Sequence, residues 1–164
     1  MSNCVILIGM PGAGKSTLGI QFAKETARNF IDTDVLIQVL ENKTLQEIVD
    51  ESGYMKLREV EAQVLVSLHS ERSVIATGGS AVYSQEGMTA LKKLGQVVFL
   101  DVDLAELRQR IHNYESRGIA RRPDQSFEDL FAERRALYLH YADVTIDCNG
   151  KTQEQIMQEL TGKL

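Results

Sequence analysis

The sequence predicts an α/β protein built on a parallel sheet. Three observations favour this class: short apolar runs of strand length alternate with amphipathic stretches of helix length, the first run is apolar throughout, and the runs end at glycine or polar turns. At 164 residues, the chain is expected to form a single domain over 1–164 around one buried core. It contains no repeat, linker or low-complexity segment.

The first strand and helix have the clearest patterns. The run Cys4 to Ile8 is continuously apolar, and the helix expected at 15–28 carries Leu18, Phe22 and Ala23 at helical spacing. The further strands are expected at 29–32, 73–76, 96–100 and 144–147. The further helices are expected at 35–40, 44–52, 55–71, 103–111, 126–141 and 152–160.

Helix boundaries follow from local residues. Gly53 separates two of the expected helices, and Ser126 opens another. Asp103 followed by Glu106 resembles a capping box, although Asp replaces the usual Ser or Thr. Gly162 is expected just past the end of the last helix.

Composition excludes several classes of function. The net charge of −5 offers no broad footprint for a nucleic acid, and 6% aromatic residues without Trp disfavour a base-stacking surface. Two cysteines, Cys4 and Cys148, cannot staple a domain of this size, so a reducing, cytoplasmic location is expected. The first apolar run stops at Gly9, which is too short for a membrane span, so no membrane partner is expected.

One stretch of the chain is rich in arginine and free of lysine. It holds seven of the ten arginines: Arg108, Arg110, Arg117, Arg121, Arg122, Arg134 and Arg135. Guanidinium groups bind carboxylates and phosphates bidentately, which favours oxyanion capture. Gly118 and Pro123 interrupt the helical pattern here, so a mobile loop is expected; a solvated helix face is the alternative.

Residues 9–16, GMPGAGKS, match the phosphate-binding pattern G-x-x-x-x-G-K-[ST] between a strand and a helix. Glycines let backbone N–H groups converge on phosphate oxygens, Lys15 neutralises the outer phosphates, and Ser16 can hold Mg²⁺. This motif predicts binding of ATP or GTP with Mg²⁺. A GTPase is disfavoured because Asn42-Lys43 lacks the aspartate of guanine-specific proteins. A motor ATPase is disfavoured by the chain's size, although Asp101 ends a hydrophobic strand as in such proteins.

Asp32 and Asp34 lie at alternate positions after the second strand, so their side chains point the same way if the backbone stays extended. Ligands of open parallel sheets bind at this end of the strands. We expect one aspartate to support Mg²⁺ and Asp34 to accept a hydrogen bond from an acceptor hydroxyl. The alternative role for Asp34 is the N-cap of the next helix.

Arg58 and the glycine turn are further candidates. Glu61 lies three residues after Arg58 and could pair with it on one helix face, holding the guanidinium for a carboxylate. Gly78 and Gly79 follow a buried strand, where they form either a tight turn or a close approach to a ligand. No cysteine–histidine cluster has the spacing of a zinc site.

Five segments together resemble the shikimate kinase family: GMPGAGKST at 9–17, DTD at 32–34, LREVE at 57–61, TGGS at 77–80 and ERRALY at 133–138. The resemblance covers nearly the whole chain. It implies a P-loop kinase three-layer sandwich, with a five-stranded parallel sheet in the order 2-3-1-4-5 flanked by helices. It also implies a helical substrate-binding segment at about 34–62 and a lid at about 112–126.

The implied activity is ATP-dependent phosphorylation of a hydroxyl on a small carboxylate-bearing metabolite, shikimate to shikimate 3-phosphate, in aromatic amino-acid biosynthesis. Kinases of this kind and size can work as monomers. The resemblance implies catalytic roles for Lys15, for Asp34 and for a lid arginine, which is Arg117 or one of Arg121 and Arg122. It implies metal binding by Ser16 and Asp32. It implies nucleotide binding by Gly12, Ala13, Gly14, Lys15, Ser16, Thr17, Arg110 and Lys151. It implies substrate binding by Asp34, Arg58, Gly78, Gly79, Ser80 and Arg134.

The chain departs from the family pattern around the acceptor pocket and the lid. Ser80 stands where the family has a third glycine, and Ala136 stands where it has a proline. After Arg122-Pro123 the chain has Asp124-Gln125 instead of Leu-Leu. Tyr54 replaces a glutamate, and Leu57 replaces a phenylalanine. The alternatives left open are a kinase of another small polyol, hydroxy acid or amino-acid alcohol, and a nucleotide-binding regulatory module without catalysis.

Overall fold

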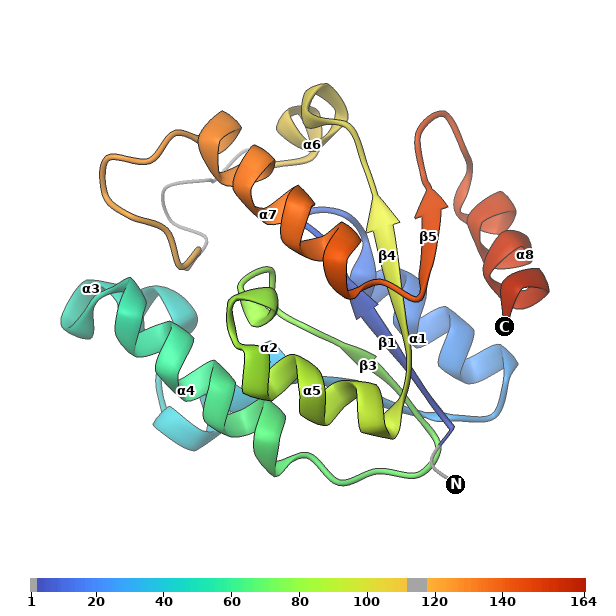
Figure 1. Cartoon of the computed structure of the whole chain (residues 1–164), viewed down its shortest axis with the longest axis horizontal. Helices are drawn as coiled ribbons and strands as arrows, with labels where there is room; N and C mark the ends of the chain where they lie inside the picture. Colours follow the sequence, from blue (N-terminus) through green and yellow to red (C-terminus); the bar gives the residue numbers. More distant parts are fainter. Residues whose placement is uncertain (1–2, 112–117) are drawn as a thin grey trace.

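The computed structural model describes residues 3–111 and 118–164, which form an α/β sandwich (Figure 1). A five-stranded sheet runs in the order β2-β3-β1-β4-β5, with every neighbouring pair parallel. The strands are β1 (Cys4–Ile8), β2 (Asn29–Asp32), β3 (Ser73–Ala76), β4 (Gly95–Asp101) and β5 (Val144–Asp147). The helices are α1 (Lys15–Glu25), α2 (Thr33–Glu41), α3 (Leu45–Ser52), α4 (Tyr54–Ser67), η1 (Ala81–Tyr83), α5 (Gln85–Leu94), α6 (Leu104–Arg110), α7 (Phe127–Tyr141) and α8 (Gln153–Lys163). The predicted fold class and strand order are confirmed.

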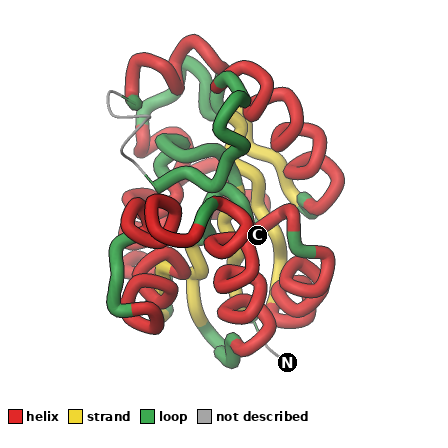
Figure 2. Tube along the Cα trace, turned by 90° about the vertical axis from the view of Figure 1, so that its left-hand side faces the viewer, coloured by secondary structure: helices red, strands yellow, loops and turns green. Residues whose placement is uncertain are grey.

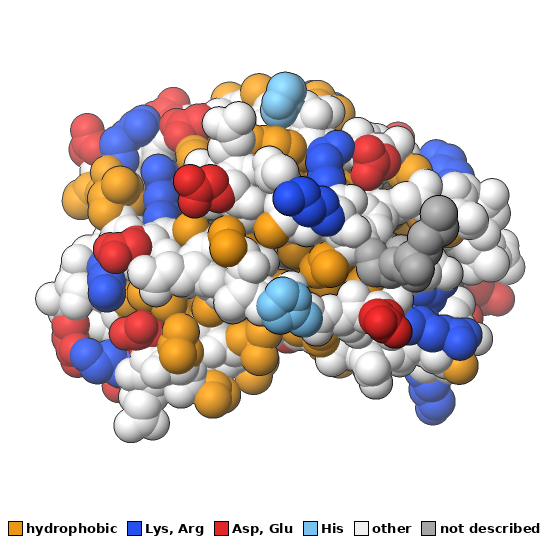
Figure 3. Space-filling view, turned by 60° about the horizontal axis from the view of Figure 1, so that its bottom comes forward, with side chains coloured by type: hydrophobic (Ala, Val, Ile, Leu, Met, Phe, Trp, Pro, Cys, Tyr) orange, Lys and Arg blue, Asp and Glu red, His pale blue; other side chains and the backbone are white. Residues whose placement is uncertain are grey.

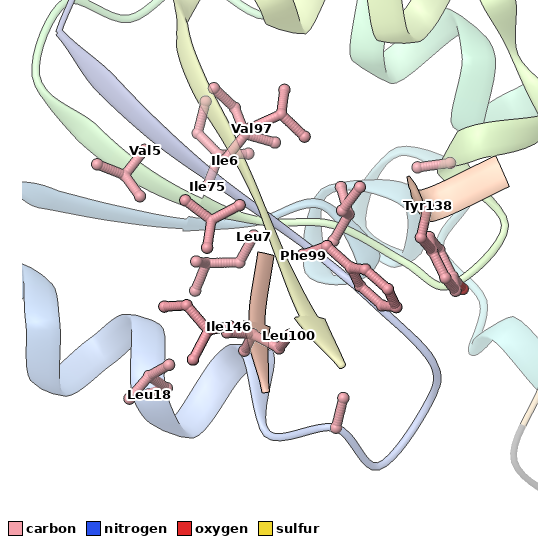
Figure 4. Close-up of a cluster of buried hydrophobic side chains, with 14 of the residues drawn as sticks. Val5, Ile6, Leu7, Leu18, Ile75, Val97, Phe99, Leu100, Tyr138 and Ile146 are labelled. Atoms are coloured by element: carbon pink, nitrogen blue, oxygen red, sulfur yellow. The ribbon is translucent and has the colours of Figure 1, made fainter. Parts of the chain in front are cut away.

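The core lies on both faces of the central strand β1. Ile6 of β1 is fully buried, opposite Ile75 of β3 and Val97 of β4. The continuous apolar run of β1 follows from this position, because a strand covered on both faces has no solvent side for polar residues. The ring of Tyr138 in α7 packs on Phe99 of β4, with centroids 5.1 Å apart (Figure 4).

Helices cover both faces of the sheet (Figure 2). Helices α1 and α8 contact each other and pack on one face, whereas α5 and α7 pack on the other. A separate small apolar cluster joins α2, α3 and α4 through Ile37, Ile48, Leu57, Val60 and Val64. Ala120 belongs to this cluster as well, so the chain after the undescribed stretch 112–117 is anchored on the α2–α4 helices.

Several predicted boundaries are wrong, and one pair of elements was not predicted. No helix is predicted from the sequence between Gly79 and Gln96, where η1 and α5 lie. Helix α1 ends at Glu25 instead of Arg28, because Ala27 adopts a left-handed backbone. Helix α4 ends at Ser67, since Leu68 is extended.

Two predicted helix signals are also wrong. Gly162 lies inside α8, which continues to Lys163. Asp103 precedes α6, but its side chain makes no capping hydrogen bond, and its backbone N–H instead donates to Asn149 Oδ1 at 2.8 Å. The local pattern could not reveal this contact, because the two residues are distant in sequence.

The surface carries charges of both signs. On the face shown in Figure 3, acidic and basic side chains are interspersed with hydrophobic ones. Among the described residues, none of the helices combines the length and hydropathy needed to cross a membrane.

Candidate active site

The loop after β1 has the geometry of an anion cradle. Gly12 and Gly14 adopt positive φ angles of 85° and 94°, which favour glycine, and Gly14 is the N-cap of α1. A Cβ at Gly12 would lie 2.9 Å from Ile111, so the loop also packs closely. Lys15 is buried and its Nζ donates to the carbonyls of Gly9 at 2.6 Å and Met10 at 2.9 Å. The helix N-terminus and the lysine therefore present positive charge to the same loop.

Ser16 and Asp32 meet at the edge of this loop. Ser16 Oγ donates to Asp32 Oδ2 at 2.8 Å, while Asp32 Oδ1 accepts from the backbone N–H groups of Asp34 and Val35. A hydroxyl and a carboxylate are hard oxygen donors of the kind that Mg²⁺ prefers beside nucleotide phosphates. These two residues can therefore hold the ion, with the remaining ligands supplied by phosphates and water.

The expected extended backbone at Asp34 is wrong. Helix α2 begins at Thr33, so Asp32 is its N-cap and Asp34 lies in its first turn. The capping role considered for Asp34 thus belongs to Asp32. Asp34 nevertheless faces the cavity described next.

A cavity of about 360 Å³ connects the phosphate loop to the acceptor side. Its lining includes Lys15 and Ser16 on one side, and Asp34, Glu61, Gly78, Gly79, Ser80 and Arg134 on the other. A Cβ at Gly78 would collide with the carboxylates of Glu61 and Asp34, and one at Gly79 would lie 2.6 Å from Arg134 Nη1. Both glycines are therefore needed because charged side chains approach the turn closely.

Glu61 is a buried carboxylate that the sequence predicts only as a partner of Arg58 and not as a site residue. It is 2% exposed and accepts a hydrogen bond from Ser80 Oγ. Burial and the nearby charge of Asp34 raise the pKa of Glu61 to about 7, although Ser80, Arg134 and Lys15 act in the opposite direction. The sequence contains a signal for this burial, because Glu61 lies on the same face of the helix as the apolar residues Leu57, Val60 and Val64.

Arg134 is a buried cation at the far wall of the cavity. It is 1% exposed, and its Nη2 donates to the carbonyl of Ala120 at 2.8 Å. Its Nε is buried and has no hydrogen-bond partner in the part of the chain that is described. A buried guanidinium with an unused donor is suited to an anionic group of a ligand.

Arg58 lies beside this cavity and not in its lining. Its guanidinium carbon is 3.7 Å from the ring centroid of Tyr83 and 5.2 Å from that of Tyr54. Arg58 lines a neighbouring, more open cavity of about 750 Å³, and Ser80 lines both cavities. The expected pair between Arg58 and Glu61 is therefore not formed among the described residues, because Glu61 turns towards Ser80.

A third cavity lies behind the phosphate loop. It has a volume of about 290 Å³, and Gly14, Thr17, Arg110 and Lys151 contribute to its lining. Arg110 Nη1 donates to the carbonyl of Gly12 at 3.1 Å, and Lys151 forms an ion pair with Glu159 at 2.7 Å. The structure thus brings together the two distant basic residues that were expected to flank the nucleotide.

The comparisons with known proteins agree with this geometry. A profile of the shikimate kinase family matches residues 11–164. Shikimate kinase from Sulfurihydrogenibium sp. is 33% identical over 161 residues, covering 98% of this chain and 96% of the relative. Shikimate kinase from Bacillus anthracis is 34% identical, with coverages of 98% and 97%. The chain belongs to the shikimate kinase family.

A solved structure supports the same assignment. Shikimate kinase from Acinetobacter baumannii in complex with shikimate is 30% identical, with a TM-score of 0.89 over 99% of this chain and 93% of that one. As a member of the shikimate kinase family, the chain is a phosphotransferase whose acceptor is a hydroxyl group.

The lid segment expected for a shikimate kinase is described only in part. Arg117 lies outside the described residues. Beyond it, Gly118 N donates to Gln46 Oε1 of α3 at 2.7 Å, so this end of the segment rests on α3. Arg122 is exposed, and its Nη2 is 3.5 Å from Glu133 Oε2.

Two departures from the shikimate kinase pattern have structural partners in this chain. Ser80, in place of glycine, has an ordinary φ of −92° and donates to Glu61. Gln125, in place of leucine, is buried, and its Nε2 donates to Glu133 Oε2 at 2.8 Å. Both replacements therefore add hydrogen bonds around the acceptor side.

Proposed function

We infer that ATP-dependent phosphorylation of shikimate, the activity of the family, is carried in this chain by the residues around the cavity between the phosphate loop and Arg134. The single observation that supports this assignment is that the nucleotide-binding and acceptor-binding residues meet in one cavity. The phosphate loop, the carboxylate of Asp34 and the buried guanidinium of Arg134 all line one cavity. A shared cavity suits the reaction, because a phosphoryl donor and a small anionic alcohol need adjacent sites.

On the nucleotide side, the loop amides of residues 12–17 and Lys15 bind the phosphates of ATP. Ser16 and Asp32 hold Mg²⁺, which when bound neutralises charge on the phosphate oxygens. Arg110 and Lys151 flank the adenine at the cavity behind the loop. Thr17 also lines that cavity, which supports a nucleotide path from the loop into it.

On the acceptor side, Asp34 accepts a hydrogen bond from the hydroxyl that is phosphorylated, and orients its oxygen towards the donor. Gly78, Gly79 and Ser80 form the floor against the acceptor ring. Arg134 binds the carboxylate, and Arg58 completes the clamp from its position beside the cavity.

Charge builds up on the transferred phosphoryl group during the reaction, so catalysis is chiefly positioning and electrostatic stabilisation. Lys15 meets this charge from the loop. An arginine of the lid, Arg117 or Arg122, meets it from the opposite side when the lid closes and excludes water. The exposed guanidinium of Arg122, 3.5 Å from Glu133, is compatible with such a movement because an exposed ion pair is weak.

An acceptor screen tests this function. ADP release is measured with ATP, Mg²⁺ and each of a set of acceptors: shikimate, other small hydroxy acids, polyols and amino-acid alcohols. We expect shikimate to give the highest kcat/KM and the background without acceptor to be low. A higher kcat/KM for an uncharged polyol would contradict a pocket built around two arginines.

A further inference from the structure

Tyr83 shares its ring between two arginines from different helices. The guanidinium carbon of Arg58, from α4, is 3.7 Å from the ring centroid, and that of Arg134, from α7, is 5.5 Å from it. Guanidinium groups are attracted to the electron-rich face of an aromatic ring at such distances. Tyr83 ends η1, directly after the glycine turn that borders the acceptor cavity.

Both arginines keep a buried donor that no described group uses. Burial lowers the pKa of Arg58, and the charge of Arg134 acts in the same direction. Each has a buried Nε without a hydrogen-bond partner in the described chain. Tyrosine rings attract a guanidinium without neutralising its charge, so both arginines remain available to an anion.

The hydroxyl of Tyr83 fixes the ring through a hydrogen bond to α7. Tyr83 Oη donates to Glu133 Oε1 at 2.8 Å, and Glu133 Oε2 accepts from Gln125 Nε2 at 2.8 Å. Burial alone would raise the pKa of Glu133, but the hydrogen bonds from Tyr83 and Gln125 and the charge of Arg122 hold it below its usual range. The ionised carboxylate therefore anchors the phenol to α7, the helix that also carries Arg134.

We propose that Tyr83 is a positioning residue that holds Arg58 and Arg134 as one carboxylate-binding pair, and so sets the preference of this enzyme for acceptors bearing a carboxylate. The inference rests on the proposed function, because it assumes that these arginines bind the acceptor. Without the ring, Arg58 loses its closest aromatic contact, and the position of its guanidinium beside the acceptor cavity becomes variable.

The first experiment measures KM for shikimate and for ATP in the wild type, Tyr83→Leu and Tyr83→Phe. We expect Tyr83→Leu to raise the KM for shikimate about ten-fold, equivalent to about 1.4 kcal/mol, and to leave the KM for ATP within about two-fold. Tyr83→Phe keeps the ring and should restore the KM to within about three-fold of the wild type. Tyr141→Leu is the matched control, since Tyr141 is half-buried at the end of α7 and lines none of the described cavities.

A second acceptor separates positioning from a general packing defect. In an analogue of shikimate whose carboxylate is replaced by a hydroxymethyl group, the arginine pair has no anion to bind. Tyr83→Leu should therefore leave the KM for this analogue unchanged. An equal rise for shikimate and for the analogue, or for ATP, would overturn the proposal.

Fluorinated phenylalanines at position 83 keep the proposal testable if Tyr83→Leu does not fold. Successive fluorination weakens the attraction of the ring for cations while it preserves the shape. The KM for shikimate should rise with each fluorine, and a constant KM would refute the role.

Arg58→Ala tests the underlying function. If this variant leaves the KM for shikimate unchanged, the proposed carboxylate clamp is wrong. If Arg58→Ala raises the KM but substitutions at Tyr83 have no effect, only the positioning role of Tyr83 is contradicted.

Discussion

The phosphate loop is made of backbone, whereas the acceptor wall is made of side chains. In the loop, positive φ angles at Gly12 and Gly14 aim the amides, and only Lys15 contributes a buried charge. The acceptor wall instead gathers Asp34 from α2, Glu61 from α4 and Arg134 from α7 in one cavity. The first arrangement is set over nine consecutive residues, and the second depends on the packing of three helices.

This difference explains where the chain follows its family and where it departs. A backbone cradle needs glycines at fixed spacing, so its motif is the same wherever ATP is bound this way. The acceptor wall can exchange side chains while the fold is kept. Three of the departures, Ser80, Tyr54 and Gln125, lie on or beside the acceptor wall. The side chains of Ser80 and Gln125 make hydrogen bonds that the glycine and leucine of the family pattern could not make.

Loss of the loop's charge should have the largest effect. Lys15→Ala removes the ammonium group that stabilises the transferred phosphoryl group, so kcat should fall by about four orders of magnitude. The melting temperature should change little. The matched control is Lys24→Ala, an exposed lysine in the last turn of the same helix. Normal ADP release by Lys15→Ala would refute the assignment of the phosphate site.

A change on the acceptor wall should be smaller and should spare ATP. Asp34→Asn keeps the shape of the side chain but removes the charge that orients the acceptor hydroxyl, so kcat should fall by about three orders of magnitude. The KM for ATP should stay within about two-fold. Asp50→Asn on the exposed face of α3 is the control. If both variants lose activity equally, the effect is not specific to the acceptor.

Elements defined by consecutive residues could be predicted from the sequence more readily than features that depend on packing. The strands at 4–8, 29–32, 73–76 and 144–147 are predicted with their observed bounds. Burial of every residue explains this for β1 and β3, whereas the edge strands β2 and β5 are only partly buried and are bounded by polar residues. Helix α5 was missed: Gly87 lies in its first turn, and only Met88 and Leu91 supply large buried side chains. Local patterns identify buried strands more readily than a short helix of this kind.

Sequence motifs identify the phosphate loop, Asp34 and the arginines as candidate site residues, but they do not predict which side chains contact one another. The pairing of Glu61 with Ser80 joins residues 19 positions apart on different elements. The stacking of Arg58 on Tyr83 likewise depends on how α4 packs against η1. Helical spacing alone suggested the wrong partner for Arg58, because it considers only neighbours within one helix.

The buried carboxylate on the acceptor wall should make stability depend on pH. The pKa of Glu61 is raised from 4.5 to about 7, so between these values the unfolded chain releases a proton that the folded protein retains. The contribution of Glu61 to the free energy of unfolding should therefore fall as pH rises through this window, by about 2–3 kcal/mol. Glu61→Gln lacks this dependence and should gain stability relative to the wild type from pH 5 to pH 8.

Urea unfolding at pH 5 and pH 8 measures this difference. Only the change in the stability gap between wild type and Glu61→Gln matters, because other groups titrate in both proteins. Glu51→Gln, at an exposed glutamate in α3, is the control and should show a nearly constant gap. A constant gap for Glu61→Gln as well would mean that Glu61 is already ionised at pH 5.

The hydrogen bond from Ser80 should have the smallest and most specific effect. The hydroxyl lowers the pKa of Glu61 by stabilising its ionised form, so Ser80→Ala should raise that pKa further. The variant should lose about 1 kcal/mol more stability at pH 8, where Glu61 is ionised, than at pH 5, where it is protonated. In the Glu61→Gln background the same substitution should cost equally at both pH values. A pH-dependent cost that persists in that background would show that Ser80 acts on a group other than Glu61, and would contradict the pairing of the two residues.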